Sequence, residues 1–206
     1  MEHFVLPNSG HVRDAGSNKL GMWLFLFTEL LLFGGLFIVY LVYRAMNPDA
    51  FLLASFELSI PMGTINTLVL LTSSMTIAMS ITALQKGKKE LALYLMMATI
   101  AAALIFMTIK FFEWNAKIHH GLFPGMELYN SLPAGESLFF FLYFFMTGLH
   151  ALHVIIGAAF IAVVIAKVGS DQVTGDRISL LENSGLYWHL VDVIWIYLFP
   201  LFYLIH

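Results

Sequence analysis

Residues 20–43 read LGMWLFLFTELLLFGGLFIVYLVY, an almost unbroken run of apolar side chains in which Glu29 is the single charged residue. An α-helix rises about 1.5 Å per residue, so a run of this length crosses the roughly 30 Å hydrocarbon core of a bilayer. The run is too long for the apolar part of a signal peptide, and it lacks a small-residue cleavage site. We therefore interpret it as a retained membrane span.

Four further apolar runs of the same kind follow along the chain. Together with the first they give five expected spans: Leu20–Tyr43, Pro61–Leu84, Leu91–Phe112, Ser137–Ala166 and Leu186–Ile205. The connections between the runs are short and contain turn residues, so none of them can form a separate domain. The sequence therefore predicts an all-α integral membrane protein, with residues 1–19 as a cytoplasmic N-terminal segment and residues 20–206 as a single bundle of five transmembrane helices.

The composition of the whole chain agrees with a protein that has lipid as its solvent. Of the 206 residues, 60% are hydrophobic and only 11% are charged, whereas soluble domains carry about 25% charged residues. The mean hydropathy is +0.84. The basic residues are scattered and the formal net charge is -3, which argues against a nucleic-acid partner. Cysteine is absent, which excludes disulfides, thiolate metal sites and covalently attached haem.

The distribution of basic residues predicts the orientation of the chain, because Lys and Arg accumulate on the cytoplasmic side of a membrane. The side that holds the N-terminus carries seven of them and the other side three. The first set is Arg13, Lys19, Lys86, Lys88, Lys89, Lys167 and Arg177, and the second is Arg44, Lys110 and Lys117. We therefore expect the N-terminus in the cytoplasm and the C-terminus outside.

Glu29 lies about 13 Å into the first span at the rise of a helix, close to the middle of the membrane. An isolated carboxylate is unfavourable at that depth, so we expect a neutral acid that is hydrogen-bonded to a neighbouring helix. Two interpretations stay open: a structural hydrogen bond, or a role in proton handling or partner contact. Since His150 and His153 lie at a compatible depth, one of these imidazoles or a nearby hydroxyl group is the expected partner.

Three histidines lie in the expected spans. His150 and His153 are three residues apart and therefore share a face of the fourth span, and His189 lies near the inner end of the fifth. Imidazoles at membrane depth can ligate haem, but a zinc site needs three or four ligands. Small residues flank the pair and allow helices to approach closely, which favours polar contacts between helices over ligation.

Asp192 follows His189 by three residues, so the two side chains can form a charge-assisted pair near the cytoplasmic boundary. Trp188 and Trp195 lie on the same stripe of the fifth span. Aromatic side chains at such a depth are typical of the belt at a membrane surface. A structural role for Asp192 is favoured over a catalytic one.

Glu113 closes the third span on the outer side, where Lys110 can pair with it at the membrane boundary. No arrangement of nucleophile and base, and no phosphate-binding loop, accompanies these charged residues. We therefore expect neither a catalytic centre nor a metal site on this chain.

Five blocks of the sequence resemble subunit III of the haem–copper terminal oxidases, in the order found in that family. They are GMWLF at residues 21–25 with Thr28-Glu29, NTLVLL at 66–71, Glu113-Trp114, TGLHALHVIIG at 147–157, and Glu182 followed by YWHLVDVIW at 187–195. The last two blocks are highly specific. With five expected spans in place of seven, the chain resembles the five-helix form of bacterial quinol oxidases and of some bacterial cytochrome c oxidases.

The resemblance implies an accessory subunit of a proton-pumping terminal oxidase in the bacterial inner membrane, with haem and copper on partner subunits. It implies direct packing against subunit I, with subunit II and a small subunit IV as further partners, and bound phospholipid. Glu29 matches a membrane-embedded acid that is associated with proton uptake in the family. Lys167 falls where the family places a basic residue near lipid headgroups, and Glu182 joins the polar residues expected between helices.

Other functions remain as alternatives. The chain could be the related membrane subunit associated with nitric oxide reductases, which shares the fold. It could be the membrane anchor of a haem b quinol dehydrogenase, with His150, His153 or His189 as haem ligands. A free-standing proton or ion transporter is disfavoured, because Gly or Pro does not clearly break any span at its midplane.

Overall fold

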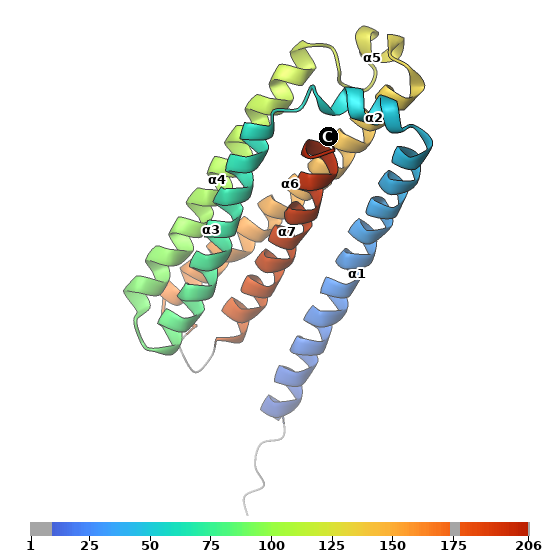
Figure 1. The fold of residues 1–206 in the computed structure, drawn as a ribbon. Coiled ribbons are helices and arrows are strands. Elements are labelled where there is room, and N and C mark those ends of the chain that lie inside the picture. Colours follow the sequence, from blue (N-terminus) through green and yellow to red (C-terminus); the bar gives the residue numbers. More distant parts are fainter. Residues whose placement is uncertain (1–9, 174–177, 206) are drawn as a thin grey trace, which may run out of the picture.

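The computed structural model describes residues 10–173 and 178–205, with side chains from Leu20 onward. Its five long helices are α1 (Gly10–Met46), α3 (Ile60–Gln85), α4 (Lys89–His119), α6 (Ala134–Gly169) and α7 (Ser179–Tyr203). Two short helices, α2 (Pro48–Ser55) and α5 (Glu127–Ser131), lie together at one end of the bundle (Figure 1). Each long helix contains a stretch that is apolar enough to cross a membrane, so the expected class of an all-α protein with five spans is confirmed.

The chain passes along the bundle an odd number of times. The described start of α1 and the turn between α3 and α4 lie at one end, and the described end of α7 lies at the other end, beside α2 and α5 (Figure 1). The helix α1 already begins at Gly10, within the segment 1–19 that we expect in the cytoplasm. Arg177 and the side chains of Arg13 and Lys19, which contribute to the predicted orientation, lie outside the described residues.

Several helices extend beyond the apolar runs that mark them in the sequence. The helix α4 continues to His119, so that Glu113 and Lys117 lie inside it and not in a connection. The helix α7 begins at Ser179, well before the expected start at Leu186. Hydropathy marks only the most apolar stretch of a helix, whereas backbone hydrogen bonding continues through polar residues.

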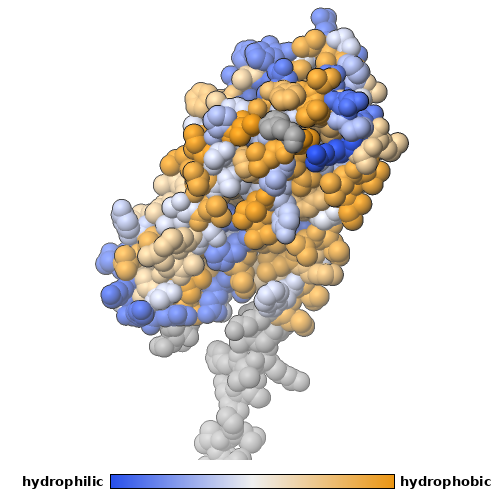
Figure 2. Space-filling view, in the orientation of Figure 1, coloured by the Kyte–Doolittle hydropathy of each residue, from blue (hydrophilic) through white to orange (hydrophobic). Residues whose placement is uncertain are grey.

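The helix α7 lies at the centre of the bundle and α1 at its periphery. The antiparallel pair α3 and α4 makes the most extensive helix contact, and α7 packs against α3, α6 and α1. Half of the most apolar stretch of α7 is buried, but only 17% of that of α1. Apolar side chains cover much of the flank seen in Figure 2, and hydrophilic residues gather at the two ends.

The close approach of α6 and α7 depends on Gly157. A Cβ atom at this position would lie 2.9 Å from Cε3 of Trp188 and 3.1 Å from Cε1 of Tyr187. These distances are shorter than the contacts that carbon atoms normally make. Only glycine therefore fits between the two aromatic side chains.

Candidate functional site

Glu29 reaches from α1 to α6, where its Oε2 atom lies 2.9 Å from Nε2 of His153. Both side chains are largely withdrawn from the surface, with exposed fractions of 16% for Glu29 and 9% for His153. The expected contact between Glu29 and one of the two imidazoles of α6 is therefore confirmed.

The hydrogen bonds of His153 restrict where protons can lie. Its Nδ1 atom is 2.8 Å from the carbonyl oxygen of Leu149, and because a carbonyl can only accept, Nδ1 carries a hydrogen. In a neutral imidazole Nε2 is then an acceptor, so Glu29 donates its proton to it. In the other arrangement a carboxylate lies beside an imidazolium. Both arrangements hold one proton between Oε2 and Nε2, and the pair is neutral as a whole.

Aromatic rings surround the Glu29–His153 pair. The ring of Phe33 contacts that of His153 edge-on with centroids 5.2 Å apart, and Tyr187 of α7 lies parallel to it at 6.5 Å. Phe25 in turn stacks on Tyr187 at 5.9 Å. Because these rings keep water away, the hydrogen bond between the acid and the imidazole is stronger than it would be at an exposed surface.

His150 lies one turn before His153 but in a different environment. It is fully buried between Phe106 of α4 and Trp195 of α7, with ring centroids 5.5 and 5.2 Å away. Neither of its ring nitrogens has a hydrogen-bond partner among the described residues. The expectation that His150 joins helices by a hydrogen bond is wrong, because the ring joins α4, α6 and α7 by aromatic packing.

A row of hydroxyl groups on α3 binds the polar side chains of α7. Three pairs make this seam: Ser74 with Nδ1 of His189 at 2.6 Å, Ser73 with Nε1 of Trp188 at 2.9 Å, and Thr67 with Nε1 of Trp195 at 3.0 Å. His189 is thus an interhelical contact, as expected. Both indole groups donate to hydroxyl oxygens in the interior.

The seam overturns two expectations about α7. His189 does not pair with Asp192, whose two carboxyl oxygens are buried and lack a hydrogen-bond partner in the described part of the chain. Trp188 and Trp195 are fully buried and do not form a belt at the membrane surface. The physical reason is that α7 is the central helix, so the stripe that the sequence assigns to the surface packs on α3.

Lys110 and Glu113 form an ion pair, as expected, but it lies in the interior of the bundle. The Nζ and Oε2 atoms are 2.8 Å apart and the exposed fractions of the side chains are 0% and 2%. Lys110 also donates to the hydroxyl oxygens of Tyr203 at 2.8 Å and Tyr143 at 3.3 Å. The Tyr203 hydroxyl donates to Oε1 of Glu113 at 2.6 Å. The pair is not exposed, because α4 continues past Glu113 and α6 and α7 cover it. Its place at the membrane boundary stays a prediction.

Glu182 and Lys167 lie near the ends of their helices. Glu182, in the first turn of α7, lines a hollow of about 400 Å³ with Trp23 and His189. Its side chain makes no hydrogen bond or ion pair within the described residues, so the expected polar contact with another helix is not formed. Lys167 is half-buried in the last turn of α6.

The described residues contain no group of three or more His, Asp or Glu side chains that could hold a metal ion. Both ring nitrogens of His153 are engaged, and His150 is enclosed by two aromatic rings. The Glu29–His153 pair, the Lys110–Glu113 pair and the hydroxyl groups of α3 have polar partners within the bundle, whereas His150 and Asp192 have none among the described residues.

The chain is similar to known proteins over nearly its full length. The family model for cytochrome c oxidase subunit III matches residues 9–206. The chain is 30% identical over 205 residues to the probable quinol oxidase subunit 3 of Staphylococcus saprophyticus, covering 100% of this chain and 97% of that protein. It is 33% identical over 192 residues to cytochrome c oxidase subunit 3 of Neurospora crassa, covering 88% of this chain and 65% of that protein.

A third relative joins two subunits in one chain. It is the heme-copper oxidase subunit I+III of Aeropyrum pernix, which is 28% identical over 211 residues. The match covers 100% of this chain and only 24% of that longer protein. The family model and these relatives confirm the resemblance that the five sequence blocks indicate, and the chain therefore belongs to the cytochrome c oxidase subunit III family.

Proposed function

We propose that this chain is the accessory, non-redox subunit III of a proton-pumping haem–copper terminal oxidase, which reduces oxygen to water in the inner membrane of a bacterium. It packs directly against subunit I and stabilises it, with subunit II and a small subunit IV as further partners. Haem and copper lie on the partner subunits, and this chain has no catalytic centre. Family membership and the relative that combines subunits I and III in one chain support this assignment.

The Glu29–His153 pair carries the further proposal that the subunit supports proton uptake. A carboxyl group and an imidazole are 2.9 Å apart in the membrane-spanning part of the protein and share one proton. Acid and imidazole groups at hydrogen-bond distance are the usual elements of proton relays in membranes. The proton can move between them without a change in their joint charge, so the step needs no compensating ion.

The lipid-binding part of the proposal rests on Lys167. This side chain is half-buried at the end of α6. Lys89, at the adjacent start of α4, donates to the carbonyl oxygen of Gly169 at 3.0 Å and pairs with Asp171 at 2.6 Å. A lysine that stays available beside these bonds suits a phosphate group at the membrane surface.

The assembly is tested by purification of the complex through a tag on this chain. We expect mass spectrometry to find the other oxidase subunits and a difference spectrum to show their haem. The isolated chain should show no haem absorption. A stoichiometric Soret band from the isolated chain that disappears in His150→Ala would overturn the non-redox assignment.

The proton role is tested by Glu29→Gln. We expect this variant to assemble normally but to turn over more slowly in steady state, or with a changed pH dependence, because Gln can donate a hydrogen bond to Nε2 yet cannot transfer a proton. Oxygen consumption by the purified complex measures this from mildly acidic to mildly alkaline pH. The control is Glu90→Gln, an exposed acid at the start of α4. If Glu29→Gln behaves like the parent at every pH, Glu29 is only a structural contact.

A further inference from the structure

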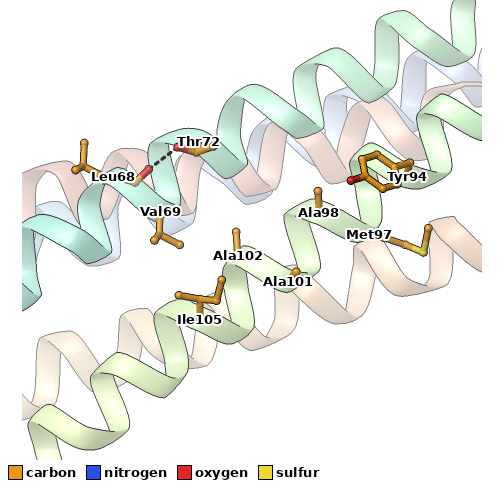
Figure 3. A pocket seen from close by; sticks show the side chains of 9 residues that line it. All are labelled: Leu68, Val69, Thr72, Tyr94, Met97, Ala98, Ala101, Ala102 and Ile105. Atoms are coloured by element: carbon orange, nitrogen blue, oxygen red, sulfur yellow. Dashed lines mark hydrogen bonds between the residues drawn. The ribbon is translucent and has the colours of Figure 1, made fainter.

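An apolar groove runs along the outer flank of the pair α3 and α4. A hollow of about 690 Å³ lies in it. Figure 3 shows the floor of small side chains, Ala98, Ala101 and Ala102 on α4, with Tyr94 towards one end and Ile105 towards the other. Thr72 does not make the groove polar, because its hydroxyl donates to the Leu68 carbonyl of its own helix at 2.8 Å.

The same flank of the two helices is hollowed again next to the turn between them. A second hollow of about 370 Å³ lies between α3 and α4 and is lined by Met75, Met79 and Leu91 as well as by Lys86 and Lys88. Along α3 the lining positions of both hollows, 68, 72, 75, 79, 82 and 86, alternate in steps of four and three, so they form one face of the helix. Positions 91, 94, 98, 101 and 105 do the same on α4. From the start of α4 to Ile105 the groove is about 24 Å long at the rise of a helix.

Two free cations lie at the mouth of this groove. Lys86 and Lys88 flank Gly87, whose φ of 71° makes the tight turn between α3 and α4. Both lysines are exposed, and neither side chain makes a hydrogen bond or ion pair within the described part of the chain. The neighbouring Lys89, in contrast, is engaged by Asp171. Hydrophilic residues gather around this turn in Figure 2, directly below apolar surface.

We propose that the groove binds one anionic phospholipid, with an acyl chain along the alanine floor and the phosphate at Lys86 and Lys88. The apolar lining matches the chain, and the two unpaired ammonium groups match a headgroup of net negative charge. A partner helix seated on the alanine floor is the competing occupant, and the test below distinguishes it. The inference deepens the lipid-binding part of the proposed function and rests on it.

The test uses a phosphatidylglycerol probe with a photoactivatable acyl chain and a phosphatidylcholine probe with the same chain. Each is added to phosphatidylcholine vesicles that contain the purified complex, and labelled peptides are quantified. We expect phosphatidylglycerol to label residues 91–105 several-fold more strongly. Lys86→Gln with Lys88→Gln should remove this preference, whereas Lys86→Arg with Lys88→Arg should keep it, because the charge is retained.

Filling the floor tests the acyl-chain part of the site. Ala98→Leu with Ala101→Leu should reduce labelling of this peptide by both probes several-fold. The matched control is Ala162→Leu, an exposed alanine on α6 outside the groove, which should leave the labelling unchanged. The lysine variants change exposed residues and should not disturb folding. They therefore still test the site if the two leucine substitutions impair folding.

Two results would overturn the proposal. Equal labelling of the parent by both probes would mean ordinary lipid contact without a headgroup site. Labelling of the isolated full-length chain that is lost in the complex would mean that a partner subunit covers the groove. Co-purification of the oxidase subunits is measured on the same samples. If the oxidase subunits co-purify but the expected labelling is not seen, only the groove assignment is overturned. If the oxidase subunits do not co-purify with the parent chain, the proposed function is overturned.

Discussion

At the scale of single residues, Lys110 shows how a charge is accommodated deep in this protein. It has a carboxylate on the same helix as its counter-ion and hydroxyl groups from two other helices as further acceptors. The faces of Trp195 and Tyr143 lie 5.0 and 5.1 Å from Nζ and add cation–π attraction. The charge of Lys110 is therefore satisfied entirely by protein groups, which is the condition for keeping an ion pair out of water.

Lys110→Met should destabilise the protein strongly, by roughly 3–5 kcal/mol, because it leaves the carboxylate of Glu113 buried without its cation. Thermal unfolding of the purified protein in detergent measures the effect. The double variant Lys110→Met with Glu113→Gln should recover much of the loss, since no charge then remains in the interior.

Glu90→Met is the control for loss of a charge on the same helix, because Glu90 is exposed, and it should leave the unfolding temperature nearly unchanged. A single Lys110→Met variant as stable as the parent would mean that the ion pair contributes nothing.

From the sequence, the partner of Glu29 could be narrowed to His150, His153 or a nearby hydroxyl group, but the contacts of His150 and Asp192 could not be predicted. Glu29 lies on an apolar helix, so few polar groups at its depth can form a hydrogen bond with its carboxyl group. His153 is one of them. His150 and His153 share a face of α6 by their spacing. In the structure His153 points towards α1, whereas His150 lies between Phe106 and Trp195. Spacing along one helix does not tell which neighbouring helix a side chain meets.

At the scale of helices, hydropathy finds all five spans but neither of the two short helices. For α3 the expected span Pro61–Leu84 nearly equals the observed Ile60–Gln85, because turn residues flank the apolar run closely. For α7 the expected start is late, since Ser184 and Gly185 interrupt the run of large apolar residues. In the structure both are buried against the bundle, and the Cβ position of Gly185 lies 3.0 Å from Ile81. Such a contact between helices leaves no signal in the hydropathy of one helix.

Gly157→Ala should separate α6 from α7 and destabilise the protein by about 1–3 kcal/mol, the usual effect of overpacking. Trp188 cannot easily move aside, because its indole nitrogen is bound to Ser73. Thermal unfolding in detergent, with Trp fluorescence as the signal, measures the change.

Gly148→Ala is the matched control in the same helix. A Cβ atom at Gly148 meets nothing within 4 Å, so this variant should be neutral or slightly stabilising, since Ala favours a helix by up to about 1 kcal/mol over Gly. Equal effects of the two substitutions would contradict the role of Gly157 as a close-contact position.

At the scale of the whole molecule, the ends of the bundle differ in charge and α1 is only loosely attached. Within the described side chains, two hydrogen bonds tie α1 to other helices: Glu29 with His153, and the Tyr40 hydroxyl with the Leu201 carbonyl near the end of α7. Lys110 is buried in α4, so it does not count among the surface charges that set the orientation. Lys117 is buried as well, so Arg44 remains among the described basic residues of the α2 and α5 end, and the predicted asymmetry in favour of a cytoplasmic α3–α4 turn becomes larger.

The orientation can be measured with single cysteines in this cysteine-free chain. Ser170→Cys, after α6, should be labelled from the cytoplasmic side, and Ser131→Cys, in α5, from the outer side, because the positive end of the bundle stays inside. Both positions are exposed. A membrane-impermeant maleimide applied to intact cells and to inverted vesicles distinguishes the two sides. Labelling of both from the same side would contradict the model of five spans.

The ion pair of Lys110 and Glu113 also bears on how the chain enters the membrane during its synthesis. Both partners lie on α4, so their contact can form as soon as this helix leaves the ribosome, before Tyr143 and Tyr203 have been made. A single charge costs about 2.5–3.5 kcal/mol at the middle of a membrane helix, and Lys110 and Glu113 lie nearer the end of α4. As neighbours at a spacing of three residues they enter as a neutral unit, and the two tyrosines complete the enclosure when α6 and α7 arrive. The order of the residues along the chain thus lets α4 enter the bilayer without waiting for the rest of the protein.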